Sequence, residues 1–536
     1  MALVMRMKGS NGISPCRVCN ITGIHGGTSR THYVPLRRFP QSDPPQYDPS
    51  QLPIRVHDEL MAQAREVEST PNRATQDRLS KKYGIKGTPI LSAATSISFP
   101  ASFPFDFMHL IWENLIPNLI LFWTGSFKDL NHEDEAYVIS PAAWKDIGER
   151  TAACKSTIPS AFGAPVPNIA TQRGQMTSEM YSNWTLFIAP HVLFNRFQQP
   201  LYYKHFIKLV NLLKMCLEFE ISDEMLDQID GGFKSWVEEY EKLYYRYQPH
   251  RLSACPLTLH ALLHIAWGIR TAGPVWTYWA FPMERHCNAL LPSIRSRRHP
   301  YASISAFVTA MAQLHQIRLK YNVHLELCLS PEVEKFSRNA FVSDSYPSYK
   351  LHQPRRLEAI SLHLQDKFYA ALATRFEKTK AVIQAIVDLN KPITQYGRIT
   401  CLGGGDTIVC HDMVRKSHDS RDASHIKYVQ MVDKYARYRN RRSEYVKRTF
   451  FGQAKRALVL DLPATPQLGL SSPSTVIYLV VETLKIRVEN NLIYYSEKGP
   501  IELVDLDTVQ CLVGRIWDRN RWGIVDRSNV TIAQLD

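Results

Sequence analysis

The spacing of hydrophobic and polar positions changes near residue 396. Before that point apolar side chains recur every three or four residues, which is typical of amphipathic helices. The pattern predicts charged helices between 51 and 84, a mainly helical region from 105 to 321, and further helices between 354 and 390. The longest amphipathic stretches lie within 218–247, 257–269 and 300–321.

Beyond residue 396, β-branched runs alternate with turn residues, which predicts an antiparallel sheet or barrel. Asn490-Asn491 and Lys498-Gly499-Pro500 are the expected turns between strands. The runs are TVIYLVVETLKIRV, LIYYSE, IELVDL, VQCLVGRIW and WGIVDRS. We therefore expect an α+β protein. Its expected segments are a first part with a cysteine-containing turn (1–45), a mainly helical part (46–275), a second helical part (276–395) and a small β domain (396–536).

The composition is that of a globular protein, with 45% hydrophobic and 21% charged residues. Lysine and arginine number 64 against 50 acidic residues, so the formal net charge is +14. This excess favours a polyanionic partner, nucleic acid before a membrane surface. The ten cysteines are spread thinly, which argues against a secreted disulfide scaffold. No secretory signal opens the sequence, and the most apolar segment (108–123) is too short to span a bilayer. We expect a soluble intracellular protein with no membrane partner.

Two pairs of metal-ligating side chains have suitable spacing. Cys16 and Cys19 are separated by two residues, so one tight turn can direct both thiolates at a single zinc ion. His260 and His264 are four residues apart and would share one face of a helix. Together the pairs predict a structural zinc site that joins the start of the chain to a distant helix.

Other interpretations of these pairs remain open. The two cysteines could be incidental or a redox pair, although no thioredoxin-like strand and helix surround them. The two histidines could be core residues beside three leucines. His25 and His32 are rival ligands that lie nearer to the cysteines in the sequence.

Carboxylates next to aromatic residues form a second group of candidates. Glu284 follows Trp279, Phe281 and Met283, so we expect it to be partly buried and paired with Arg285, with another arginine or with a divalent metal. A structural ion pair is the simpler interpretation. Asp106, His109 and Glu113 recur at helical intervals and could share a face, with Asp106 near the helix start. Helix capping is their simplest role, and catalysis is the weaker alternative for Asp106 and Glu113.

Arginine-rich runs are the candidates for nucleic-acid contact. One run lies at 295–299, and the other lies within 427–448, where tyrosines are interleaved. Guanidinium groups grip phosphates and tyrosines can stack on bases, but a solvated surface explains most such runs. The candidate residues are Arg295, Arg297, Arg298, Arg437, Arg439, Arg441 and Arg442.

The segments that contain the cysteine pair, the histidine pair, the carboxylate candidates and the first arginine-rich run together resemble the C-terminal two-thirds of a CACTA-type (En/Spm-like) DNA transposase, in the form abundant in basidiomycete fungi. The similarity is spread over nearly the whole chain, and the combination is more specific than any one motif. The matching stretches are MKGSNGISPCRVCNITGI with THYVPL, FPFDFMHLIWENLIPNLILFWTG, CPLTLHALLHIAWGIRTAGPVWTYWAFPMER, IRSRRHPYASISAFV and VQCLVGRIWDRNRWGIVDRS.

The resemblance implies an RNase H-like core split by a helical insertion, with 1–45 and 276–395 as parts of the core. Such enzymes hold two Mg²⁺ ions with three carboxylates and use them for DNA strand cleavage and joining. The family pattern places a CxxC and an HxxxH on either side of the insertion, matched here by Cys16, Cys19, His260 and His264. Glu284, about twenty residues after His264, fits the third acidic position.

The departure from the family pattern lies at the N-terminus. The family has one catalytic aspartate shortly before the CxxC and another further upstream, but nothing acidic precedes Cys16 here and the first acidic residue is Asp43. One glutamate cannot organise a two-metal site. We therefore expect an N-terminally truncated transposase that is inactive as written, nuclear and DNA-associated, in which Mg²⁺ acts only if the upstream segment is restored.

Two further functions stay open on the sequence. One is a domesticated, non-catalytic protein that is stabilised by zinc and binds DNA or other proteins, so whether the chain is an enzyme is not decided. The other is an unrelated zinc hydrolase built on His260, His264 and Glu284, which is disfavoured because Ala261 stands where such enzymes carry a glutamate base. A homo-oligomer is compatible with the sequence.

Overall fold

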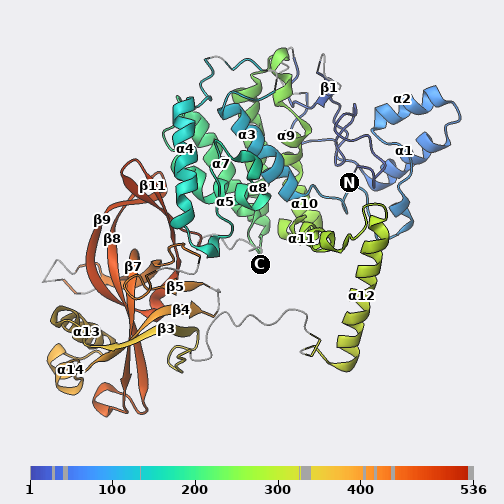
Figure 1. The fold of residues 1–536 in the computed structure, drawn as a ribbon. Coiled ribbons are helices and arrows are strands. Elements are labelled where there is room, and N and C mark those ends of the chain that lie inside the picture. The colour runs from blue at the N-terminus through green and yellow to red at the C-terminus, as the bar shows by residue number, and fades with distance from the viewer. Residues whose placement is uncertain are drawn as a thin grey trace. The chain divides into compact units, whose positions relative to one another are not determined.

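The computed structural model describes residues 2–26, 31–39, 46–128, 130–132, 134–324, 326–327, 340–402, 406–415, 419–435, 441–442 and 444–528. The chain divides into two compact units, and Figure 1 labels the elements of both. Unit 1 comprises Met1–Pro117, Met215–Lys335 and Ala533–Asp536, and unit 2 comprises Asn118–Lys214 and Phe336–Ile532. Helix accounts for 43% of residues and strand for 21%, so the expected mixture of helices and sheet is confirmed.

Unit 1 is mainly helical. Its described strands are short, β1 (Ile24–His25) and β2 (His32–Tyr33), which pair antiparallel. A π-helical segment, η2 (Met108–Leu115), continues into α3 (Ile116–Trp123), which crosses into unit 2. The other α-helices in the described part of this unit, with two segments that continue them, are α1 (His57–Ser69), α2 (Arg73–Tyr83), α8 (Asp223–Tyr240) with η7 (Glu241–Tyr245), α9 (Leu257–Ala261) with η9 (Leu262–His264), α10 (Ile265–Ala272), α11 (Phe281–Leu290) and α12 (Pro300–Tyr321).

The predicted helices of this unit are confirmed, and their ends follow ordinary capping rules. Asn72 caps α2 by accepting a hydrogen bond from the Thr75 amide, and Gly84 ends that helix in the left-handed conformation. Ser222 caps α8 through the Met225 amide. α8 then buries Leu226, Ile229, Phe233, Trp236, Val237 and Tyr240 on one face.

α11 and α12 differ from the other helices of unit 1. Neither contains a buried residue, although α12 is 22 residues long. α12 still carries many large apolar side chains, and Figure 1 shows it standing apart from the helices around it. The exposed ones are Tyr301, Phe307, Val308, Met311, Ile317, Leu319 and Tyr321.

Unit 2 is built on a ten-stranded antiparallel sheet in the order β10-β6-β7-β8-β9-β12-β11, to which β4 pairs through β7 and in turn pairs β3 and β5. The strands are β3 (Tyr349–Glu358), β4 (Ile393–Cys401), β5 (Thr407–Val409), β6 (His425–Asp433), β7 (Tyr445–Leu462), β8 (Ser474–Glu489), β9 (Leu492–Asp505), β10 (Val509–Leu512), β11 (Gly514–Asp518) and β12 (Arg521–Val525). The helices are α4 (Pro141–Ala153), α5 (Ser178–Asn183), α6 (Ala189–Val192), α7 (Pro200–Cys216), whose last residues belong to unit 1, α13 (Leu362–Arg375) and α14 (Lys380–Ile386).

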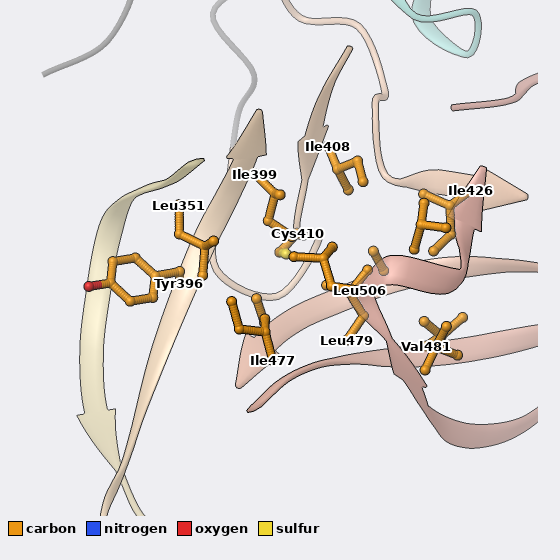
Figure 2. Close-up of a cluster of buried hydrophobic side chains, with 14 of the residues drawn as sticks. Leu351, Tyr396, Ile399, Ile408, Cys410, Ile426, Ile477, Leu479, Val481 and Leu506 are labelled. Atoms are coloured by element: carbon orange, nitrogen blue, oxygen red, sulfur yellow. The ribbon is translucent and has the colours of Figure 1, made fainter. Parts of the chain in front are cut away.

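The central strand β8 is buried on both faces, which explains its nearly unbroken apolar run. Ile477, Leu479 and Val481 point into one core with residues of β4, β5 and β6 (Figure 2). The alternate residues Val476, Tyr478 and Val480 point into a second core with α13 and α14. Because side chains alternate along a strand, successive apolar residues of β8 pack into the cores on opposite faces of the sheet.

Polar contacts join α4 and the segment after α6 to β11 within unit 2. The Asp518 carboxylate is 1% exposed and lies 3.2 Å from Arg150 Nε and 3.1 Å from an Arg196 guanidinium nitrogen. Both arginines also pair with Asp146 of α4. Arg519 Nε lies 2.8 Å from the other carboxylate oxygen, so three guanidinium groups balance this buried charge.

The sheet differs from the sequence expectation in extent. It begins at β3 rather than at residue 396, and residues 354–358, expected as helix, lie in that strand. LIYYSE and IELVDL form one strand, β9, instead of two. The described ends of the basic stretch 427–448 lie on the paired strands β6 and β7. Within the described part of the chain, no helix is long and apolar enough to cross a membrane.

Candidate metal centre

The turn that contains Cys16 and Cys19 is held by main-chain amides and by the Arg55 side chain. The amides of Val18 and Cys19 both donate to Cys16 Sγ at 3.4 Å. Arg55 Nε donates to the carbonyl oxygens of Cys16 and Cys19 at 3.1 and 3.3 Å. Because the carbonyls are fixed from outside the turn, both sulfur atoms point inward.

The two histidines come from the consecutive helical segments α9 and η9. Their spacing of four residues places both rings on the same side, with ring centroids 4.9 Å apart. Phe105 stacks on the His264 ring at 6.2 Å, and the Arg17 guanidinium lies 4.0 Å from the centre of the Phe105 ring. The rings are therefore fixed by packing as well as by the backbone.

The four side chains converge on one buried point. Cys19 Sγ lies 3.1 Å from His260 Nε2, and Cys16 Sγ lies 3.5 Å from His264 Nε2. The two Nε2 atoms are 3.0 Å apart. All four residues are buried, and one ligand atom from each lies within 4.8 Å of the others. The expected convergence of the two motifs is confirmed, and the cluster could bind a metal ion.

The electrostatics of the cluster suit a cation. Burial opposes ionisation of Cys16, but the hydrogen bond with Cys19 and the charge of His264 hold the pKa of the Cys16 thiol well below its usual range. Burial and the neighbouring Cys16 raise the pKa of Cys19. Burial lowers the pKa of His260 and favours its neutral, metal-binding form.

His25 and His32, the rival ligands, lie apart from this cluster. Their rings contact each other at 5.5 Å between centroids, and His32 Nδ1 is 3.0 Å from the Asn11 carbonyl oxygen. Among the described residues neither belongs to a metal-binding group. Sequence reasoning missed Arg55, which is only 3% exposed and orients the thiol turn; no motif around it signals that role.

Glu284 lies in a second cluster, which the sequence did not predict as a unit. His109 Nε2 is 3.0 Å from Glu284 Oε1 and 3.7 Å from Glu113 Oε2. His109 Nδ1 pairs with Asp106. Partial burial lowers the pKa of His109, but the hydrogen bond with Asp106 and the charges of both glutamates outweigh it, so the net shift is upward.

This arrangement corrects the expectation for Glu284. Its side chain is 47% exposed, in keeping with the expected partial burial, but its ion-pair partner is His109 rather than an arginine. α11 itself packs no residue into a core. Glu284 does not join His260 and His264 in either metal-binding group of the described residues, so nothing supports a hydrolase built on those three. The expected capping role of Asp106 is confirmed, because its carboxylate accepts the His109 amide at 2.9 Å.

The candidate nucleic-acid residues are solvent-exposed where the structure describes them. Arg295, Arg297 and Arg298 lie between α11 and α12 in unit 1. Arg441 and Arg442 lie at the tip of the β6–β7 hairpin, with the Arg441 guanidinium 5.0 Å from the centre of the Tyr435 ring. Arg437 and Arg439 fall outside the described residues.

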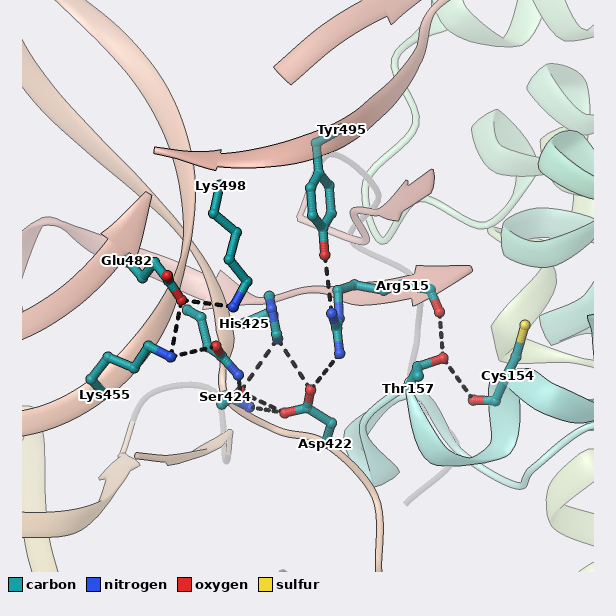
Figure 3. A network of polar contacts seen from close by, with 11 residues as sticks. Cys154, Thr157, Asp422, Ser424, His425, Lys455, Glu482, Tyr495, Lys498 and Arg515 are labelled. Atoms are coloured by element: carbon teal, nitrogen blue, oxygen red, sulfur yellow. Dashed lines mark hydrogen bonds and ion pairs between the residues drawn. The ribbon is translucent and has the colours of Figure 1, made fainter. Parts of the chain in front are cut away.

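Unit 2 contains a buried Asp-Ser-His group that resembles a hydrolytic triad only in composition (Figure 3). Ser424 Oγ donates to Asp422 Oδ1 at 2.6 Å, and His425 Nδ1 lies 3.2 Å from Asp422 Oδ2. Burial lowers the pKa of His425 to about 4. The serine proton is therefore bound by the aspartate, and Ser424 is only 2% exposed, so the group lacks an activated, accessible nucleophile. Arg515 pairs with Asp422 at 2.7 Å and makes the group a structural network.

Comparisons with known proteins give no assignment, because no family model matches the chain and no curated protein matches it.

Proposed function

We propose that this chain is a fragment of a CACTA-type DNA transposase that is stabilised by zinc, binds DNA and acts in the nucleus. The observation that carries the proposal is the convergence of Cys16 and Cys19 with His260 and His264 across 248 positions of the sequence. If the chain folds like the family that it resembles, the cysteine pair and the histidine pair must lie together. Neither pair by itself predicts that contact.

Zinc fits the cluster better than a harder cation does. Two sulfur and two nitrogen donors are the set that structural zinc prefers, whereas Mg²⁺ and Ca²⁺ take oxygen. Zinc–sulfur bonds of about 2.3 Å and zinc–nitrogen bonds of about 2.0 Å place sulfur and nitrogen roughly 3.5 Å apart in a tetrahedron. The separations of 3.1 and 3.5 Å need little adjustment to reach that geometry.

The region around Glu284 also supports the proposal. In an RNase H-like core, α11 and α12 would pack against core strands that lie outside this sequence. Their apolar side chains and their lack of buried residues agree with such a missing neighbour. Glu284, half exposed on α11, would then face the two upstream aspartates that hold Mg²⁺ in the family.

DNA binding by the full chain is the direct test. We expect fluorescence anisotropy with double-stranded DNA to show association that weakens steeply with salt. Replacing Arg295, Arg297 and Arg298 together with alanine should lower the slope of log affinity against log salt by up to about three, because each phosphate contact contributes about one.

A matched control uses three exposed basic residues of the same unit, Arg78, Lys81 and Lys82 on α2. Replacing these with alanine removes the same charge, and we expect a smaller change in slope. Equal slopes for the two triple variants would show that only net charge matters, and no binding at low salt would contradict the proposal.

The non-catalytic alternative is favoured by one observation, that Glu284 already has a partner in His109. The catalytic and the non-catalytic function can be distinguished in a chain to which the upstream family segment has been added. A catalytic role predicts that Mg²⁺-dependent strand cleavage is lost in Glu284→Gln while DNA affinity is kept. Cleavage that survives this substitution would remove Glu284 from the reaction.

A further inference from the structure

A group of metal-ligating side chains lies apart from the thiol cluster, on two elements that are far apart in the sequence. His109 and Glu113 lie on η2, and Glu284 lies on α11. One ligand atom from each lies within 4.8 Å of the others. The three side chains are 46%, 41% and 47% exposed, so solvent reaches the point between them.

Asp106 fixes the direction of the imidazole. An ionised carboxylate can only accept hydrogen bonds, so the contact between Asp106 Oδ2 and His109 Nδ1 places the proton on Nδ1. Nε2, the atom that faces both glutamates, releases its proton when a cation takes its place, and its lone pair then serves as a ligand. A carboxylate that holds the far nitrogen of a metal-binding histidine is a common supporting arrangement at metal sites.

The same aspartate also joins the two elements. Asp106 Oδ2 accepts the His109 amide at 2.9 Å, and Asp106 Oδ1 accepts the Ala280 amide at 2.7 Å, one residue before α11 begins. One carboxylate therefore sets the start of η2, the ring of His109 and the approach to Glu284.

We propose that His109 Nε2, Glu113 and Glu284 bind one divalent transition-metal ion, with Asp106 as the positioning residue. Ligand atoms held at about 2.1 Å from one ion lie roughly 3.0 Å apart in an octahedron and 3.4 Å apart in a tetrahedron. The observed separations of 3.0 and 3.7 Å from Nε2 are close to these values. The remaining coordination positions face solvent and accept water or a phosphate oxygen.

The donor set determines the class of ion. Imidazole suits zinc and other transition metals, whereas Mg²⁺ and Ca²⁺ prefer oxygen donors alone. Manganese accepts both carboxylate and imidazole ligands and is paramagnetic, which makes it a convenient probe. Zinc should compete more strongly than manganese, and Mg²⁺ only weakly.

The test measures Mn²⁺ binding to the full chain by electron paramagnetic resonance, after the thiol cluster has been loaded with zinc. The signal of free Mn²⁺ decreases as the ion binds, so affinity follows from a titration. We expect His109→Ala and the double variant Glu113→Gln with Glu284→Gln to lose binding by more than about tenfold. Asp106→Asn should weaken it by about tenfold, as loss of a supporting carboxylate does elsewhere.

His315→Ala is the matched control, since His315 is an exposed histidine on α12. It should leave Mn²⁺ affinity within roughly twofold of the unchanged chain. Thermal unfolding of each variant identifies any that fail to fold, and the conservative Glu113→Gln single variant keeps the test available if His109→Ala does. The proposal is overturned if the folded variants bind Mn²⁺ as well as the unchanged chain, or if Mg²⁺ displaces Mn²⁺ as readily as Zn²⁺ does.

This inference does not rest on the proposed function, because the titration contains no DNA. A chain that binds Mn²⁺ through His109 but fails to bind DNA would support the metal site and contradict the transposase assignment. DNA binding without Mn²⁺ binding would support the assignment and overturn the metal site.

Discussion

Glu241 shows how a single buried carboxyl group can hold a distant segment. It is only 2% exposed, and its carboxylate accepts the amides of Leu36 at 2.6 Å and of Arg37 at 3.3 Å. Burial raises its pKa to about 7, although the two amides act in the opposite direction. The carboxyl group therefore binds a proton more tightly in the folded chain than in the unfolded one.

This shift predicts a pH dependence of unit 1. A raised folded pKa contributes stability that is complete below the unfolded value near 4.5 and is lost as pH rises through about 7. The loss amounts to about 3 kcal/mol of unfolding free energy. Glu241→Gln cannot titrate, so its unfolding free energy relative to the unchanged chain should rise by that amount between pH 4.5 and 8. Chemical denaturation at several pH values measures the difference.

Glu220→Gln is the matched control for Glu241, because Glu220 is exposed and precedes the same helix. This control removes an exposed carboxylate and leaves the Glu241 contacts in place. A pH profile that is the same for all three chains would contradict the assignment to Glu241.

At the residue scale, spacing predicted ligands but not burial. The four zinc candidates were identified because thiol and imidazole spacing is a local property of a turn and of a helix. The half-exposed side chain of Glu284 agrees with the expected partial burial, although its aromatic neighbours Trp279 and Phe281 do not draw α11 into a core. The meeting of Glu284 with His109 depends on the fold, and only the spacing of Asp106, His109 and Glu113 gave a partial signal.

Gly452 allows the close approach of two strands in the sheet of unit 2. It lies in β7 opposite Thr483 of β8, and a Cβ at this position would fall 2.2 Å from Val481 Cγ1 and 3.0 Å from the Glu482 carbonyl oxygen. Only a residue without a side chain allows the two strands to approach in this register.

We expect Gly452→Ala to lower the unfolding free energy of unit 2 by about 1–3 kcal/mol, as overpacking does in other cores. Gly174→Ala is the matched control in the same unit, because a Cβ there meets nothing within 4 Å. Denaturant unfolding followed by a unit 2 signal measures both. Equal effects of the two substitutions would show that Val481 moves aside without cost.

At the element scale, helices were predicted more accurately than strands. Pro300–Tyr321 was identified at both ends, because proline starts the helix and its periodic pattern is local. Lys498-Gly499-Pro500 was expected to break a strand, but the β8–β9 register shifts there and the Thr483 hydroxyl donates to the Pro500 carbonyl oxygen at 2.9 Å. A bulge absorbs these residues, and bulges depend on the neighbouring strand.

At the scale of the whole molecule, zinc should stabilise one unit and not the other. All four ligands belong to unit 1, whereas the sheet belongs to unit 2. Removing zinc with a strong chelator should lower the midpoint temperature of the unit 1 transition. The midpoint of the unit 2 transition should stay unchanged. A loss of about 3 kcal/mol would shift a unit of this size by roughly 6–12 °C.

Metal analysis completes this prediction. The unchanged chain should contain about one zinc in the thiol cluster, and Cys16→Ser with Cys19→Ser should lose it. Cys287→Ser is the control, because Cys287 is an exposed free cysteine of the same unit. Zinc content that is unchanged by the double substitution would place the ion elsewhere.

Local sequence patterns could not predict how the chain divides into units. Residues 118–214 have the same helical periodicity as their neighbours, yet they belong with the sheet, partly because Arg150 and Arg196 pair with Asp518. Such long-range pairs leave no trace in the spacing of nearby residues. Composition therefore predicted the helical and β-rich regions but not which of them pack together.

The cysteine–histidine cluster joins two parts of unit 1 that are separated in the sequence by a segment of unit 2. Residues 118–214 lie between Cys19 and His260 in the sequence but outside the unit that those ligands close. A protease nick in that stretch would leave both flanking pieces anchored to a shared ion and to a shared apolar core, so they should coelute. New termini introduced there by circular permutation should be tolerated for the same reason.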